Sequence, residues 1–174
     1  MNSAAGRPAV LGILGACALM VAATAPAWAQ LSEEAQAGAR KDCLNTDGKT
    51  PEKRSIDGCT LLINNLEMSP QVEVTLRYLR GSTLVATKDY DRALLDLDRV
   101  VALYDTAQDK ASWRPEAIEK VTWSYEWRAA AHMALNRCEE ATADYVKASQ
   151  MAREITERDK YKTYALNACK GGSQ

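Results

Sequence analysis

The 174-residue chain has no phenylalanine and one histidine, His132. Strand-forming residues are scattered along the sequence, so β structure has little to build on. A single histidine with no Gly-x-Ser-x-Gly element offers no local acid–base constellation for catalysis. His132 falls on the apolar side of an expected helix, where we expect it to pack in the core. These absences argue against a sheet-based fold and against an enzyme.

The chain also lacks an excess of positive charge, because 22 basic residues face 23 acidic ones. Arg7 is the one charge before residue 30, so the later part carries 21 basic against 23 acidic residues and a net charge of −2. Nucleic acids and anionic lipid surfaces favour basic partners, so both are disfavoured. After the run from Ala9 to Ala25, no apolar stretch approaches membrane-spanning length.

The N-terminal 29 residues have the pattern of a secretory signal peptide. The apolar run is followed by Ala27-Trp28-Ala29, a small-x-small cleavage pattern. We therefore expect a soluble mature domain over residues 30–174, starting at Gln30, in the periplasm or outside the cell. An alternative is a lipoprotein signal, Leu14-Gly15-Ala16-Cys17, which would anchor the protein through Cys17.

Seven helices are predicted from apolar residues that recur at helical spacing, and no strand is predicted. Pro51, Pro70 and Pro115 each fall where a helix is expected to begin, a position that tolerates a missing N–H. The expected helices cover residues 32–45, 51–67, 70–87, 90–105, 115–135, 138–154 and 157–169.

Four cysteines remain after residue 29, and an even number in an exported chain indicates disulfides. No close Cys-x-x-Cys pair suggests a metal site. Four cysteines allow three pairings. Antiparallel hairpins would bring together Cys43 with Cys59 and Cys138 with Cys169, whereas cross-pairing would join opposite ends of the chain. We predict these two disulfides.

Two stretches share a spacing pattern. Gly81 is followed 12 residues later by Ala93 and then by Leu97, and Ala129 is followed at the same spacings by Ala141 and Tyr145. Small residues at such places let two helices cross closely. The pattern resembles tetratricopeptide repeats, and a more degenerate unit covers 32–70. The stretch around Cys43 and Cys59 resembles exported repeat proteins of alphaproteobacteria. The resemblance implies an all-α stack of antiparallel hairpins with a capping last helix.

The same resemblance implies a groove lined by the first helix of each unit. Its partner-binding positions fall on Tyr78, Ser82, Trp123, Glu126 and Met133, with Thr75, Val85 and Ala130 at the remaining groove places. Trp123 and Trp127 lie four apart on one helix face, which could be groove or core. The basic and Asn residues that clamp peptide carboxylates in this family are absent, so we do not expect a chaperone-tail receptor.

Two acidic or polar stretches are expected to be structural. The stretch Asn45-Thr46-Asp47-Gly48 faintly resembles a calcium-binding loop. Cys43 and Arg54 would then occupy its first and last ligand places, and neither residue is a calcium ligand. We therefore expect a polar turn there. Asp96 and Asp98 are two apart on a helix and point to different faces. We expect both aspartates to be solvated.

Together these features predict an exported, non-catalytic repeat scaffold that binds a protein or peptide and uses no cofactor. The alternatives are an accessory or assembly subunit of a cell-envelope complex, and a small periplasmic enzyme. A groove with exposed aromatic residues would favour the scaffold, and a closed pocket with converging acid–base groups would favour an enzyme.

Overall fold

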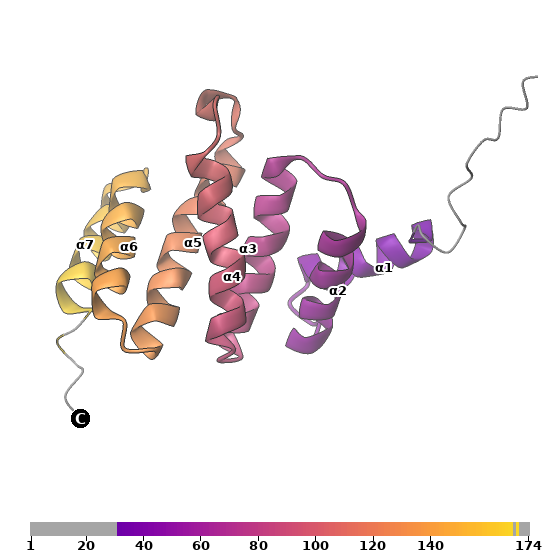
Figure 1. The fold of residues 1–174 in the computed structure, drawn as a ribbon, viewed down its shortest axis with the longest axis horizontal. Helices are drawn as coiled ribbons and strands as arrows, with labels where there is room; N and C mark the ends of the chain where they lie inside the picture. The colour runs from indigo at the N-terminus through magenta and orange to yellow at the C-terminus, as the bar shows by residue number, and fades with distance from the viewer. Residues whose placement is uncertain (1–30, 169, 171–174) are drawn as a thin grey trace, which may run out of the picture.

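The computed structural model describes residues 31–168 and Lys170, and this part of the chain is helical without strands. The predicted signal peptide, residues 1–29, lies outside the described residues. Seven α-helices and one short 3-10 helix follow one another along the long axis in chain order (Figure 1). Their bounds are α1 Glu33–Leu44, α2 Glu52–Asn65, α3 Pro70–Ala86, α4 Tyr90–Asp105, η1 Lys110–Ser112, α5 Pro115–Ala134, α6 Cys138–Met151 and α7 Ile155–Asn167.

The helix starts follow the proline signals with one difference. Pro70 and Pro115 open α3 and α5 as predicted. Pro51 instead precedes α2 as its N-cap with extended backbone, and the helix begins at Glu52. At the other end of the chain, α6 ends at Met151 and α7 begins at Ile155, so the turn between them is earlier than predicted.

The turn between α1 and α2 is the predicted polar turn. Asn45 and Gly48 both have positive φ, of 41° and 66°, which these two residue types tolerate. The Asn45 side chain holds the turn closed, because Thr50 N–H donates to its Oδ1 at 2.8 Å and its Nδ2 donates to the Thr50 carbonyl at 3.3 Å. These two hydrogen bonds fix the backbone of Thr50, two residues before α2 begins.

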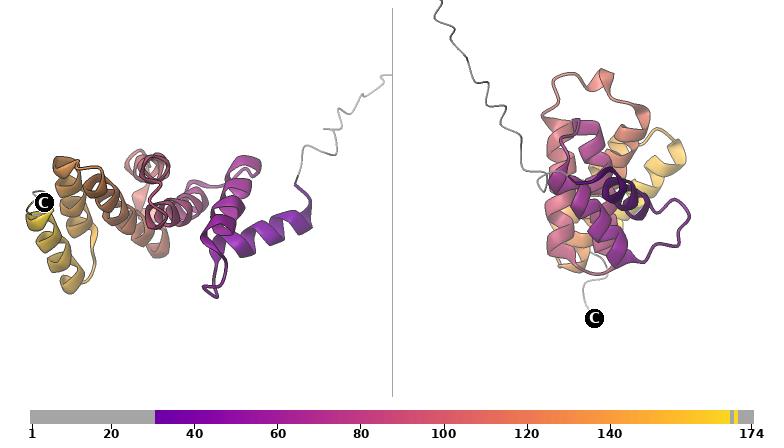
Figure 2. Two further views of the ribbon diagram at one scale, coloured as in Figure 1. Left: turned by 90° about the horizontal axis from the view of Figure 1, so that it is seen from below. Right: turned by 90° about the vertical axis from the view of Figure 1, so that its right-hand side faces the viewer.

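The helices pair as antiparallel hairpins, α1/α2, α3/α4 and α5/α6, with α7 packed on α6 at the end of the stack (Figure 2). The largest core cluster draws on all five helices from α3 through α7 and includes the fully buried Val74, Val121 and Tyr161. One smaller cluster lies between α3, α4 and the end of α5, and another lies between α1, α2 and α3. The all-α stack of hairpins predicted from the sequence is confirmed.

Small residues sit at the helix crossings, as the repeated spacing predicted. A Cβ on Gly81 would lie 2.9 Å from Leu97 Cγ, closer than carbon atoms pack. In the next hairpin Ala129 is fully buried, and Tyr145 occupies the place of Leu97. The second helix of each hairpin therefore approaches the first only because the facing side chain is small.

Each of these hairpins also carries a buried arginine–aspartate pair at a sequence separation of 16. Arg80 donates to Asp96 through Nε at 2.6 Å and Nη2 at 2.7 Å. Arg128 donates to Asp144 through Nε at 2.8 Å and Nη2 at 2.5 Å. Two parallel N–H···O bonds make such a pair strong and directional. The Arg–Asp pair is thus part of the repeat.

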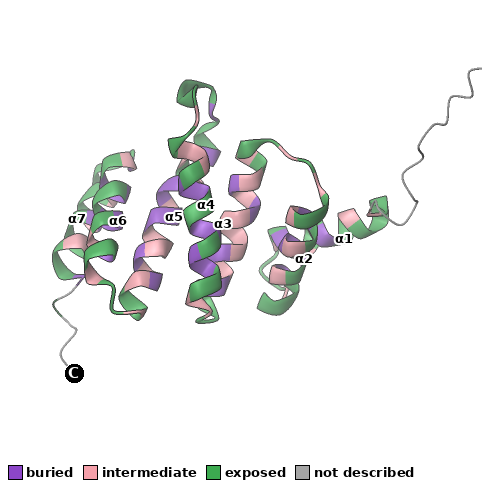
Figure 3. Ribbon diagram, in the orientation of Figure 1, coloured by how far each residue is buried: buried purple, intermediate pink, exposed green. Residues whose placement is uncertain are grey.

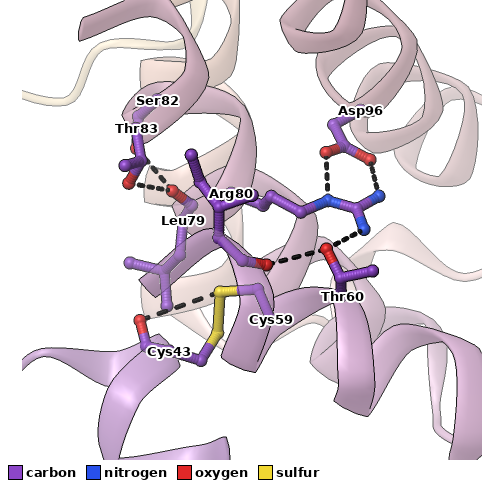
Figure 4. Close-up of a disulfide and its surroundings, with 9 residues drawn as sticks. Cys43, Cys59, Thr60, Leu79, Arg80, Ser82, Thr83 and Asp96 are labelled. Carbon is purple, nitrogen blue, oxygen red and sulfur yellow. Dashed lines mark hydrogen bonds and ion pairs between the residues drawn. A yellow bond between two sulfur atoms is a disulfide. The ribbon is translucent and has the colours of Figure 1, made fainter. Parts of the chain in front are cut away.

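Each arginine also reaches back to the preceding hairpin. Arg80 Nη1 donates to Thr60 Oγ1 of α2 at 2.9 Å (Figure 4). Arg128 Nη1 donates to Asp98 Oδ1 of α4 at 2.8 Å. One guanidinium therefore connects three consecutive helices, which fixes the stacking of one hairpin on the next.

The burial of Asp96 corrects the prediction that it is solvated. Asp96 is 2% exposed and accepts hydrogen bonds from both Arg77 and Arg80, whereas the Asp98 side chain is 59% exposed as expected. The two carboxylates do point to different faces of α4, and buried and exposed residues alternate along this helix (Figure 3). The prediction failed because the compensating arginines lie on another helix.

The predicted disulfide between Cys43 and Cys59 is present and joins α1 to α2, with Cα atoms 4.7 Å apart (Figure 4). Its sequence separation of 16 equals that of the two Arg–Asp pairs. The neighbouring Gly58 lets α2 approach α1, because a Cβ there would lie 2.8 Å from the Ala39 carbonyl oxygen. Cys169, the predicted partner of Cys138, lies outside the described residues.

Candidate partner-binding surface

An aromatic pair joins two of the predicted groove residues across α3 and α5. The ring centroids of Tyr78 and Trp123 are 5.8 Å apart with a tilt of 39°. Lys120, one turn before Trp123, places its Nζ 6.0 Å from the Tyr78 ring and 5.7 Å from the Trp123 ring. Burial raises the pKa of the Tyr78 hydroxyl above its usual value. Both residues are partly buried.

Trp123 and Trp127 have different surroundings. Trp127 packs against the buried cluster that contains Leu84 and Ala131. Trp123 belongs to none of the core clusters and forms part of the wall of a surface cleft. Of the two tryptophans, Trp123 is therefore the one that lines a surface cleft.

The cleft beside Trp123 lies between the first half of α5, the end of α6 and the start of α7, and has a volume of about 350 Å³. Met151 and Ile118 contribute apolar surface. Four carboxylates that form no ion pair among the described residues also line it: Glu116, Glu119, Glu154 and Glu157. Arg153 is the single cation on the lining, so the cleft combines an aromatic wall with a net negative charge.

Glu126 is oriented toward α7, the last helix. Its carboxylate accepts a hydrogen bond from Tyr161 Oη at 2.8 Å and from Lys160 Nζ at 3.1 Å. Tyr161 is fully buried, and burial together with the hydrogen bond to Glu126 raises its pKa far above the usual value. Glu126 therefore helps to attach α7 to α5, and 28% of its side chain remains exposed.

Ser82 and Met133 lie apart from the aromatic pair. The Ser82 hydroxyl donates to the Leu79 carbonyl of its own helix at 3.1 Å. Met133 is 40% exposed and its sulfur accepts a hydrogen bond from Tyr145 Oη at 3.7 Å. It lines a separate hollow of about 230 Å³ with Tyr164. The structure thus brings Tyr78 and Trp123 together and leaves Ser82 and Met133 outside that contact.

The remaining groove positions and His132 contribute little to an open surface. Val85 is 8% exposed, and Thr75 Oγ1 donates to the Gln71 carbonyl at 3.1 Å. His132 is largely buried: its Nε2 is 3.9 Å from Asp144 Oδ2, and its Nδ1 has no hydrogen-bond partner. Burial lowers the pKa of His132. The expectation that His132 packs inside is confirmed.

Sequence reasoning missed Lys120 and Lys160, which lie beside the predicted groove residues Trp123 and Glu126. Lys120 lies one turn from Trp123, so helical spacing alone could have indicated it. The contribution of α7 depends on how the chain turns after Met151, which local patterns do not determine.

Within residues 31–168, no cluster of His, Cys, Asp and Glu is arranged to hold a metal ion. Among the described helices, none is both long and apolar enough to cross a membrane. No protein-family model, curated protein or solved structure matches the chain.

Proposed function

We propose that this protein is an exported, non-catalytic helical scaffold that binds a segment of a partner protein on the face formed by α3, α5 and α7. The observation that carries the proposal is the Tyr78–Trp123 pair, which stands open beside a cleft of about 350 Å³. Partly exposed tryptophan and tyrosine side chains are the residue types that most often dominate binding energy in protein interfaces.

The compartment and the repeat family are part of the same proposal. The Cys43–Cys59 disulfide supports an oxidising location such as the bacterial periplasm. The repeated crossings at Gly81 and Ala129 support assignment of the hairpins to the tetratricopeptide kind. In such a stack, the first helices of successive units offer one continuous surface to a peptide.

The test is the affinity of the Trp123→Ala protein for a partner isolated from the envelope fraction of the producing cell. We expect binding to weaken about 30-fold, which corresponds to about 2 kcal/mol for the loss of an aromatic anchor. Leu95→Ala is the matched control, because Leu95 lies on α4 with 72% exposure and lines neither the cleft beside Trp123 nor the hollow beside Met133. Thermal unfolding of both variants separates lost binding from lost folding.

The exposed Leu95 also gives the alternative function a specific test. A large apolar side chain on the second helix of a hairpin would suit an accessory subunit that docks through the outer face of the stack. In that case Leu95→Ala weakens binding and Trp123→Ala does not, which would replace the scaffold proposal with the accessory-subunit one.

A further inference from the structure

A second hollow lies at the N-terminal end of the stack, where α1 and the end of α2 meet the start of α3. Its volume is about 500 Å³. Leu44 and Val72 remain 45% and 41% exposed in it. Most of its lining is apolar, contributed by Leu44, Leu62, Leu66, Met68, Val72 and Leu76. Large apolar side chains that stay exposed in a concave place are typical of interaction sites.

Two guanidinium groups border this groove. Arg40 comes from α1 and Arg114 from the residue before α5, and both residues are exposed. Within the described part of the chain neither guanidinium has an ion pair or a hydrogen-bond partner, in contrast to the doubly bonded Arg80. Glu67 is the single carboxylate on the lining, so the groove carries a net positive charge.

We propose that this groove docks a segment of a partner protein in which carboxylates are interspersed among apolar side chains. The apolar lining would bury the apolar side chains of the segment, and Arg40 and Arg114 would pair with its carboxylates. The inference rests on the proposed function, since the partner is a protein, but it depends on residues remote from Trp123.

The polar residues of the lining favour a peptide over a fatty-acid chain as the occupant. Ser69 precedes α3, and its hydroxyl makes no capping hydrogen bond. The Thr75 hydroxyl donates its hydrogen to a carbonyl within α3, so its oxygen can still accept a hydrogen bond from another group. A peptide backbone can use both groups, whereas the methylene chain of a fatty acid can use neither.

The probe is the peptide Leu-Asp-Leu-Val-Glu-Leu, with a fluorophore on its N-terminus and an amidated C-terminus, titrated with the full mature chain. We expect saturable binding that weakens about tenfold when Asn and Gln replace the acidic residues, as is usual for the loss of charged hydrogen bonds. Arg40→Gln and Arg114→Gln should each weaken binding by several fold. Arg153→Gln is the matched control, because Arg153 is an exposed arginine that lines the other cleft.

Several results would overturn the inference. These are equal binding of the acidic and the amide peptide, equal effects of Arg40→Gln and Arg153→Gln, no saturable binding, or binding of laurate in preference to the peptide. Val72→Ser should weaken binding without a change in the unfolding midpoint, because Val72 is exposed. If Trp123→Ala weakens capture of a natural partner while the arginine variants do not, this inference fails and the proposed function stands. If neither Trp123→Ala nor the arginine variants weaken binding, both this inference and the proposed function fail.

Discussion

Removal of the Asp144 carboxylate tests the Arg–Asp pairs that join the hairpins. The Asp144 side chain is 5% exposed and that of Arg128 is 18% exposed. Burial by itself lowers the pKa of Arg128, but the hydrogen bonds and charges of Asp144 and Asp98 outweigh burial and raise it. Asp144→Ala would leave a largely buried guanidinium with the exposed Asp98 as its remaining carboxylate. We expect the free energy of unfolding to fall by about 3 kcal/mol, as is usual when one partner of a buried pair is removed.

Two further variants make this prediction specific. Asp98→Ala removes a 59% exposed partner of Arg128 and should cost less than about 1 kcal/mol. Replacing both charges, as Arg128→Met with Asp144→Leu, removes the buried ions together and should cost little. The assay is urea unfolding followed by circular dichroism, with an unchanged m-value as the check that the folded state is intact. If Asp144→Ala costs no more than Asp98→Ala, the reasoning is refuted.

Three further predictions concern the disulfide, a helix crossing and the histidine. Replacing Cys43 and Cys59 by Ala should lower the free energy of unfolding by about 3 kcal/mol, the value for a loop of this length, and equal urea midpoints for the two proteins would contradict it. Gly81→Val should lower the free energy of unfolding by about 2 kcal/mol through overpacking, and an unchanged free energy would argue against the close crossing. Gly38→Ala is the control and should stabilise α1 slightly, because no atom lies within 4 Å of the added Cβ. Burial lowers the pKa of His132 below 6.5, so the contribution of neutral His132 to stability is present above pH 6.5 and is lost as the pH falls below that value. His132→Gln should make the free energy of unfolding less dependent on pH in this range, and an NMR titration midpoint of His132 above 6.5 would contradict the prediction.

Much of the fold could be predicted from the sequence because its determinants are local. Apolar spacing and prolines located the helices, and the recurrence of Gly81 and Ala129 located the crossings. Boundaries were less accurate where two signals compete. Pro51 can open a helix or precede it, and here Thr50 is held by the Asn45 side chain, so α2 starts one residue later.

The candidate surface was predicted only in part, since it depends on contacts between distant helices. Tyr78 and Trp123 lie 45 positions apart in sequence, and the repeat spacing placed both on the same face. The burial of Asp96 was missed, although Arg80 and Arg128 each precede an aspartate by 16 residues. The groove between α1 and α3 depends on the course of residues 66–69, for which the sequence offers no repeated pattern.

The most direct test of the central claim is site-specific photo-crosslinking in the producing cell, with a benzophenone amino acid in place of Trp123 or of Leu95. The account predicts a discrete adduct with a partner protein from position 123 and none from position 95, because Trp123 stands on the α3–α5 face and Leu95 lies on α4. Circular dichroism spectra of the two unirradiated proteins should match, which would show that both are folded. An adduct from position 95 together with none from position 123 would contradict the claim that the face formed by α3, α5 and α7 binds the partner.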